Sequence, residues 1–342
     1  MKKLISISLC TIALLMFELS CKKDPLGPDI TGIYGPVTVV DTLKKSAATV
    51  DFSKDESVFF TASFEKETDW VLTITGKTSG ATKTFEGISK NIDKTNALWN
   101  GTASDVPSFQ KETVTARLTF RHTADTFKTT LVTTGLKNLD KNDVLVTNFS
   151  TFKVIHPYDS TKNNPVHPNA DWPISLTTTS QAGISSPADG GKYLYMSGKP
   201  WQHINGDVLQ GFTPYVTYLN ITAAHADTDY GTYYPLLPDS NKVIFNIMVY
   251  GNGPTSKTWL EVTFMEDGVT ARHINIYPTW VGWKLLSYSY ASLLDNIATP
   301  GHPEKLQMVT FLLLSTAVPP ESTTVSVAFD HPVFTTNHPY QP

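Results

Sequence analysis

The chain has 342 residues, with 27 Lys and Arg against 31 Asp and Glu, a formal net charge of -4 and 40% hydrophobic residues. This length and hydrophobic content can fill more than one core, so we expect two domains. The slightly acidic balance, with no basic stripe, argues against a nucleic-acid partner.

The first 20 residues predict a secretory signal peptide. Two lysines precede an apolar run over residues 4–17, which is too short for a confident transmembrane helix. Cys21 follows directly after the small Ser20, and a cysteine at this point resembles the bacterial lipoprotein signal, in which it becomes the acylated N-terminus. That signal usually has leucine three residues before the cysteine, whereas this chain has Glu18. Lipidation of Cys21 is the prediction; an ordinary signal with a chance cysteine is the alternative.

Residues 21–31 are charged and contain proline and glycine, and we expect a tether. The segment resembles the tethers of lipoproteins shown on the outer surface of Bacteroidetes cells. The resemblance implies lipid anchoring in the outer membrane, facing the cell exterior. Because Cys10 lies in the signal and Cys21 would carry lipid, the mature body has no thiol for a disulfide, a zinc finger or a cysteine nucleophile.

Residues 32–150 predict the first of two all-β domains, an immunoglobulin-like sandwich. Threonine, valine and aromatic residues dominate, and no sustained helical periodicity is present. Polar stretches such as residues 65–69 separate the extended runs and should end strands. The runs cover residues 38–40, 57–64, 70–76, 114–121, 127–133 and 143–149.

The Trp-Asn-Gly turn at residues 99–101 resembles the turn of FlgD-type immunoglobulin-like modules, where Trp-Asp-Gly is usual. In bacterial surface proteins and hydrolases these modules are spacers, which implies a spacer here. Trp99 could instead be an exposed sugar platform. Large aromatics usually fill cores, so a structural role for Trp99 is favoured.

Residues 151–173 interleave prolines with polar residues and predict a linker, because proline denies hydrogen bonds to a sheet. Residues 174–342 follow as the second domain, in which eight extended runs predict two packed sheets, a jelly roll. The runs cover residues 192–196, 215–221, 243–250, 259–265, 273–277, 283–288, 307–314 and 324–329.

The order of these runs resembles the galactose-binding-like jelly rolls of carbohydrate-binding modules. Its anchors are Trp283 before an apolar strand and Asp330 just after the last strand. The Phe-Asp-His sequence around Asp330 departs from the commoner Ile-Asp-Asn ending. The resemblance implies glycan binding with no required cofactor, and a structural calcium near Asp330.

Alternation within residues 243–250 predicts which side chains face the core. The odd-numbered positions are all apolar and should lie between the sheets. The even-numbered positions should face either a concave binding surface or solvent. Trp283 precedes a buried strand and is expected in the core rather than at a ligand.

Two segments have the composition of a sugar site, where flat rings cover C–H faces and short polar groups satisfy hydroxyls. In residues 199–207, a loop bounded by proline and glycine, the candidates are Trp201, Gln202, His203 and Asn205. In residues 225–234 they are Tyr230, Tyr233 and Tyr234. Tyrosine-rich turns also cap sheets, so for either segment the binding and capping interpretations stay open.

No catalytic residues are predicted. Glycoside hydrolysis needs two carboxylates flanking a cleft, and neither Glu261 nor Glu266 is embedded in such a pattern. We therefore expect a cell-surface lipoprotein that captures poly- or oligosaccharide without turnover. In a polysaccharide-utilization system it would pass oligosaccharide to an outer-membrane transporter. The alternatives are a glycoside hydrolase or lyase on the jelly roll, and a structural or adhesive surface protein.

Overall fold

The computed structural model describes residues 37–340 except 105, 122, 148, 150–173, 178–183, 185, 187–189, 199–200, 205–206, 211–214, 220–232, 268, 296–300 and 317–323. The predicted signal, Cys21 and the tether lie outside these residues. Within them the regular structure is strand, apart from short 3-10 turns, which confirms the all-β fold class. No helix in this part of the chain is long and apolar enough to cross a membrane.

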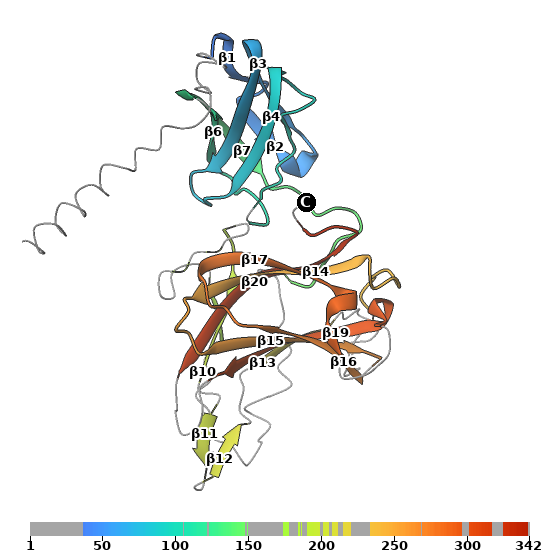
Figure 1. Cartoon of the computed structure of the whole chain (residues 1–342). Coiled ribbons are helices and arrows are strands. Elements are labelled where there is room, and N and C mark those ends of the chain that lie inside the picture. The colour runs from blue at the N-terminus through green and yellow to red at the C-terminus, as the bar shows by residue number, and fades with distance from the viewer. Residues whose placement is uncertain are drawn as a thin grey trace, which may run out of the picture.

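The first domain consists of seven strands in one hydrogen-bonded network that curls around a single core (Figure 1). The order is β1-β3-β6-β7-β2, with β4 and β5 pairing with β3. Among the strands that the structure describes, only β2 and β7 pair in parallel. The strands are β1 (Val39–Lys45), β2 (Thr49–Asp51), β3 (Val58–Gly76), β4 (Thr82–Ile92), β5 (Leu98–Trp99), β6 (Thr113–Phe120) and β7 (Thr123–Gly135).

Strand β3 runs unbroken for 19 residues, through the polar stretch at 65–69 that the sequence marks as a separator. That prediction is wrong because neighbouring strands pair with β3 before and after this stretch. On one edge β1 pairs with it up to Phe64 and β6 from Trp70 onward, while on the other edge β4 pairs on both sides of a bulge between Ser63 and Thr68. Hydrogen bonds to these neighbours hold the polar residues in the sheet despite their low strand propensity.

Trp99 is a core residue, as predicted. Its side chain is fully buried, and its Nε1 donates to the Thr102 carbonyl at 2.9 Å. The rings of Phe52 and Phe109 contact it edge-on, with centroids 4.8 and 4.7 Å away. Gly101 completes the turn at φ 91°, where a Cβ would come within 2.6 Å of the Phe52 ring.

The second domain is a jelly roll of two stacked sheets, as predicted (Figure 1). The proximal sheet, the layer next to the first domain, has the order β17-β14-β20-β10-β9, with β8 also on β20. Its strands are β8 (Val144–Leu145), β9 (Ile174–Thr177), β10 (Tyr193–Gly198), β14 (Val243–Asn252), β17 (Val281–Ser289) and β20 (Val325–Thr336).

The distal sheet, the layer farther from the first domain, has the order β13-β19-β15-β16-β18. Its strands are β13 (Tyr215–Leu219), β15 (Thr258–Glu266), β16 (Val269–Ile276), β18 (Leu294–Asp295) and β19 (Leu306–Ser315). A separate hairpin of β11 (Trp201–Ile204) and β12 (Asp207–Gln210) lies at the end of the molecule away from the first domain (Figure 1).

The alternation predicted for β14 is confirmed on the core side. Its odd-numbered residues from Val243 to Val249 are all buried between the two sheets. On the other side Asn246 and Met248 are also fully buried, so this part of the proximal sheet is not open to solvent. Asn246 accepts from Ser287 Oγ at 2.7 Å and from the backbone N–H of Tyr340 at 3.0 Å. The C-terminal segment thus covers one end of this face.

The two domains meet earlier in the chain than residue 150, where the sequence places the end of the first. Val144 and Leu145 form β8, which pairs with β20 of the proximal sheet. Phe149 is 1% exposed in the core of the second domain, and its ring meets Phe329 edge-on at 5.8 Å. Val144, Leu145 and Phe149 therefore pack as part of the jelly roll.

Trp283 packs against protein, but not between the sheets as predicted. It lies on β17 opposite Tyr250 of β14, on the outer face of the proximal sheet. The rings of Tyr250 and Tyr193 meet it edge-on at 5.5 and 5.6 Å. Leu286 and Tyr288, which point the other way, contact the main core instead. Trp283 is only partly buried in this smaller cluster.

Candidate functional site

The distal sheet turns one set of side chains into the core and the alternate set outward. Leu260, Val262 and Phe264 of β15 are fully buried between the sheets. The residues between them must therefore point away from the core, on the side farther from the first domain.

Strand register aligns the outward residues of β15 with those of its neighbours. Trp259 pairs with Leu314 of β19, and Glu261 lies between Leu312 of β19 and Asn275 of β16. We call this surface the distal face. Its described side chains are Trp259, Glu261, Thr263, His273, Asn275, Tyr277, Thr310, Leu312 and Leu314.

Two aromatic rings stack at one end of the distal face. The Trp259 and Tyr277 centroids lie 5.6 Å apart, with 27° between the ring planes. Trp259 Nε1 donates to Asn275 Oδ1 at 3.1 Å. This hydrogen bond fixes the orientation of the indole ring. Tyr277 is 48% exposed, so a large part of its ring is available to a ligand.

Polar side chains continue the face along the next two rows of the sheet. Glu261 and Asn275 are cross-strand partners, as are Thr263 and His273. The Thr263 hydroxyl donates to Glu261 Oε1 at 3.3 Å. Exposed rings beside amide, carboxylate and hydroxyl groups can cover the C–H face of a sugar while bonding its hydroxyls.

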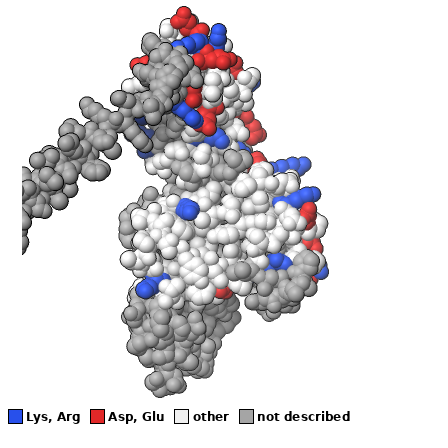
Figure 2. Space-filling model, in the orientation of Figure 1, with Lys and Arg blue, Asp and Glu red and all other residues white. Residues whose placement is uncertain are grey.

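Charge is unevenly distributed over the molecule. In the view of Figure 2, charged side chains gather over the first domain, while the middle of the jelly roll is mostly uncharged. On the distal face Glu261 is the one acidic side chain among the described residues, and no Lys or Arg lies beside it there. This composition suits a neutral ligand better than a strongly charged one.

Trp201, Gln202 and His203 lie on strand β11, not in a loop as predicted. In this hairpin β11 pairs with β12, and Trp201 lies opposite Gln210. The backbone there is described, whereas the side chains are not. Asn205 and Tyr230 lie outside the described residues. Glycan contact by the residues of this hairpin stays a prediction.

Tyr233 is 49% exposed, and its hydroxyl donates to Asp267 Oδ1. Asp267, which lies in the turn between β15 and β16, also forms a 3.0 Å ion pair with Lys305, just before β19. The hydrogen bond raises the pKa of Tyr233 and lowers that of Asp267, which Lys305 lowers further. Tyr233 thus lies at the opposite end of β15 from Trp259, apart from the aromatic stack.

Tyr234 is 4% exposed and belongs to the core, where its ring packs 6.2 Å from Phe334. Burial raises the pKa of its hydroxyl. The sequence groups it with Tyr233 as a surface contact, but neighbouring residues of an extended chain point to opposite sides. In the structure Tyr234 offers no ring face to a ligand.

Asp330 is 2% exposed, and protein donors meet both of its carboxylate oxygens. Ser186 Oγ donates to Oδ2 at 2.8 Å, and the backbone N–H of His331 donates to Oδ1 at 2.8 Å. Nowhere among the described residues do three His, Cys, Asp or Glu side chains gather as a metal site. Calcium also takes backbone carbonyl and amide oxygens, so the calcium site that the resemblance implies near Asp330 stays a prediction.

Glu266, one of the carboxylates considered for hydrolysis, is buried at the end of β15. It accepts a 2.6 Å hydrogen bond from the Tyr290 hydroxyl and lies 3.7 Å from Arg272 Nε. Arg272 in turn lies over the Tyr290 ring. This packed group supports the end of the sheet and is withdrawn from the distal face.

Sequence reasoning missed the Trp259–Tyr277 stack. Both are end residues of predicted strands, and alternation alone would turn Trp259 outward from β15. Their closeness depends on the register between β15 and β16, which pairs Leu260 with Ile276. Sequence does not display that register, because the pairing of these strands contains a bulge between Phe264 and Met265.

No protein-family model matches the chain, and no curated protein matches its sequence. Among solved structures, it is similar to a family 11 carbohydrate-binding module from Clostridium thermocellum in complex with a β-1,3-1,4-mixed-linked tetrasaccharide. The identity is 9% and the TM-score 0.33, over 56% of this chain and 95% of that one.

The chain is also similar to a surface glycan-binding protein from Prevotella bryantii, at 12% identity and a TM-score of 0.31, over 88% of this chain and 77% of that one. A cyclase from Fischerella sp. TAU is similar at 14% identity and a TM-score of 0.28, over 51% and 77% of the two chains. These values are too low to carry a function from one protein to another, so the distal face itself has to supply the functional argument.

Proposed function

We propose that the protein binds a neutral poly- or oligosaccharide on the distal face, without turning it over. The observation that carries this proposal is the Trp259–Tyr277 stack beside Asn275, with Tyr277 48% exposed. A tyrosine that only capped the sheet would not need a tryptophan held parallel to it by a side-chain hydrogen bond. Two fixed rings lose little side-chain freedom on binding, which favours affinity.

The arrangement of the domains supports presentation of this face to an external ligand. The distal face lies on the side of the jelly roll away from the first domain (Figure 1). Lipid at Cys21 would anchor the chain in the outer membrane, with the first domain as a spacer between anchor and binding domain. The captured glycan would then pass to an outer-membrane transporter.

Binding without turnover is favoured because the described part of the distal face has a single carboxylate, that of Glu261. Hydrolysis of a glycosidic bond commonly uses two carboxyl groups on opposite sides of the bond. Glu261 has no second carboxylate beside it on the described part of this face. Release of reducing ends from any bound polysaccharide would contradict this part of the proposal and favour a hydrolase.

Affinity electrophoresis against a panel of neutral plant and fungal polysaccharides tests the proposal, with Tyr277→Ala as the variant. The matched control is Tyr233→Ala, because Tyr233 is equally exposed, at 49%, on the other end of β15. Loss of one stacking ring should weaken binding about tenfold. Retardation lost in Tyr233→Ala and kept in Tyr277→Ala would move the site to the segment first predicted from the sequence.

Anchoring is tested separately with Cys21→Ala in cells. The variant should leave the membrane fraction and keep its binding in the affinity gel. A Cys21→Ala protein that stays in the membrane after a high-salt wash would contradict the lipoprotein assignment without touching the binding proposal.

A further inference from the structure

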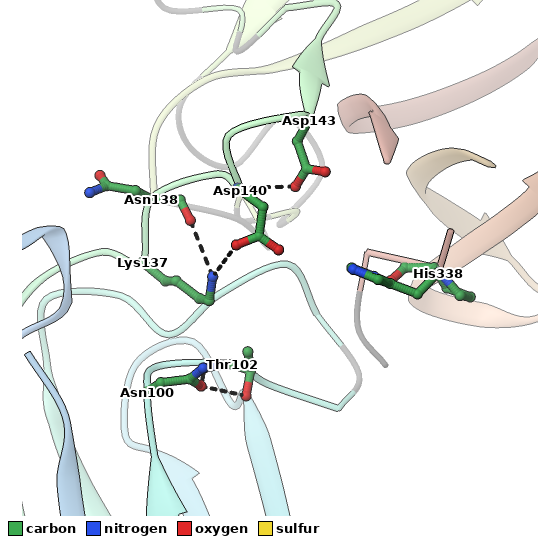
Figure 3. A network of polar contacts seen from close by, with 8 residues as sticks. Asn100, Thr102, Lys137, Asn138, Asp140, Asp143 and His338 are labelled. Carbon is green, nitrogen blue, oxygen red and sulfur yellow. Dashed lines mark hydrogen bonds and ion pairs between the residues drawn. The ribbon is translucent and has the colours of Figure 1, made fainter. Parts of the chain in front are cut away.

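A polar cavity of about 160 Å³ lies between the two domains. Three separate parts of the chain form its walls (Figure 3). The first domain supplies the turn after Trp99, the connecting segment supplies residues 137–143, and the C-terminal segment supplies the opposite side. The lining residues are Asn100, Thr102, Lys137, Asn138, Asp140, Asp143, His338 and Tyr340.

The connecting segment is held in place on the first-domain side. Asn138 Nδ2 donates to the Ser53 carbonyl at 2.8 Å, and Lys137 Nζ lies 3.1 Å from Asp140 Oδ1. The backbone N–H of Asp140 donates to Asp143 Oδ2 at 3.1 Å. These contacts use one oxygen of Asp143 and orient its carboxylate, as Figure 3 shows.

The opposite wall is fixed by the jelly roll. The backbone N–H of Tyr340 donates to Asn246 Oδ1 at 3.0 Å, and the Thr335 hydroxyl donates to the His338 carbonyl at 2.6 Å. His338 lies across the cavity from the two aspartates (Figure 3). Because both walls are held by their own domains, the cavity is built before any ligand arrives.

The lining chemistry selects the kind of ligand. Amide and hydroxyl groups donate to and accept from sugar hydroxyls, carboxylates accept from them, and Tyr340 adds an aromatic ring. Two aspartates against Lys137 make the charge unfavourable for an anion. The volume lies well below the roughly 300–1,000 Å³ of drug-sized pockets, yet it exceeds the share of a single water, about 30 Å³. One small hydroxyl-rich ring fits these limits.

Asp143 provides a reason for a ligand to bind rather than water alone. Burial raises the pKa of its carboxyl, and the neighbouring charge of Asp140 adds to the effect. A desolvated carboxylate gains from hydrogen bonds donated to it. Two adjacent sugar hydroxyls donate in the geometry that a carboxylate accepts.

We propose that this junction cavity binds a single neutral sugar unit, held by Asp143 and Asn100 with His338 on the far side. The site is independent of the distal face and would make the first domain a participant in glycan binding as well as a spacer.

Saturation-transfer NMR of the full mature chain tests this with four free neutral monosaccharides, glucose, galactose, mannose and xylose, with glucuronic acid as the anionic comparison. At least one neutral sugar should give a signal with millimolar affinity, and glucuronic acid should not. Asp143→Asn, which keeps the size of the side chain, should weaken that binding at least tenfold. Tyr277→Ala should leave it unchanged while losing polysaccharide retardation.

Other outcomes would overturn the proposal. Monosaccharide binding that is lost in Tyr277→Ala and kept in Asp143→Asn would place all sugar binding on the distal face. No signal from any of the four sugars would remove the site. If Ca²⁺ abolishes the saturation-transfer signal of all four sugars equally, the cavity is a cation site instead. In each case the distal-face proposal stands or falls by the affinity gel, separately.

Discussion

The two domains use the same strand alternation but differ in where they put their largest rings. In the first domain Trp70 and Trp99 are fully buried. In the distal sheet of the second domain Trp259 points outward and stacks on Tyr277. Composition gives only part of this difference: residues 32–150 contain two tryptophans and one tyrosine, and residues 174–342 contain four and twelve, but these numbers do not tell which rings point outward.

The outward positions explain this difference. On β6 of the first domain Arg117 lies between the buried Ala116 and Leu118, and its exposed side chain makes that outer face polar. The corresponding outward position at the start of β15 is Trp259. An aromatic ring at such a position exposes apolar surface to water. Single exposed rings are common, whereas adjacent exposed rings usually mark a binding surface. The comparison predicts that rings of the first domain govern stability and rings of the distal face govern binding.

The largest effect is expected from Trp99→Ala. Removing a fully buried indole with two edge-on aromatic contacts should cost about 3–5 kcal/mol of the free energy of unfolding. Urea denaturation followed by circular dichroism measures this. Leu98→Ala is the control, since its side chain, on the same short strand, is 40% exposed and should cost about 1 kcal/mol or less. Equal costs for the two variants would show that Trp99 is not part of the core.

Phe149→Ala should cost nearly as much, about 3–4 kcal/mol, and should destabilise the jelly roll rather than the first domain. Its ring fills the second core against Phe329. Calorimetry of the full chain should show the jelly-roll transition shifted down and the other transition unmoved. For the same reason a chain that starts at residue 171 should be less stable than one that starts at residue 137. A shift confined to the first-domain transition would restore the domain boundary at residue 150.

Sequence reasoning located the strands of the jelly roll well, because alternating apolar residues in β14, β15 and β19 are a local signal. It also placed Trp99 correctly, since the turn that follows it has a recognisable pattern. Features that depend on partners were missed. β4 shows no regular alternation of apolar residues, and its strand is defined by its pairing with β3.

The binding residues were harder to predict for the same reason. Trp201 and Tyr233 stand out in composition, whereas Trp259 and Tyr277 are 18 positions apart and meet only through strand register. Tyr234 was grouped with its neighbour, although adjacent residues face opposite sides. The calcium that the resemblance implies near Asp330 stays a prediction; in the structure Ser186 and the backbone N–H of His331 donate to its carboxylate.

A smaller effect should follow from Trp259→Phe, which keeps an aromatic ring and removes the hydrogen bond to Asn275. Losing one hydrogen bond that orients the ring should weaken polysaccharide binding roughly two- to tenfold, less than Tyr277→Ala does. Titration calorimetry with the best polysaccharide from the affinity gel measures this. Asn275→Ala should match it, and the double variant should be no weaker than either. Additive losses would mean that Asn275 contacts the glycan directly instead of orienting Trp259.

The smallest effect expected is a gain in stability from Asp143→Asn at the domain junction. Burial raises the pKa of Asp143 above its ordinary value of 3.8, so the folded protein holds this proton more tightly than the unfolded chain does. The charged carboxylate therefore destabilises the fold at pH 7, and this cost disappears as the pH falls below 3.8. Asp143→Asn should raise Tm slightly at pH 7 and not at pH 3.5.

Asp140→Asn is the control, because it removes the ion pair with Lys137 and should not raise Tm. A gain in Tm that is the same at both pH values would come from altered hydrogen bonding. A gain that vanishes in acid would show that the Asp143 carboxylate lowers stability, which is common for residues kept for binding.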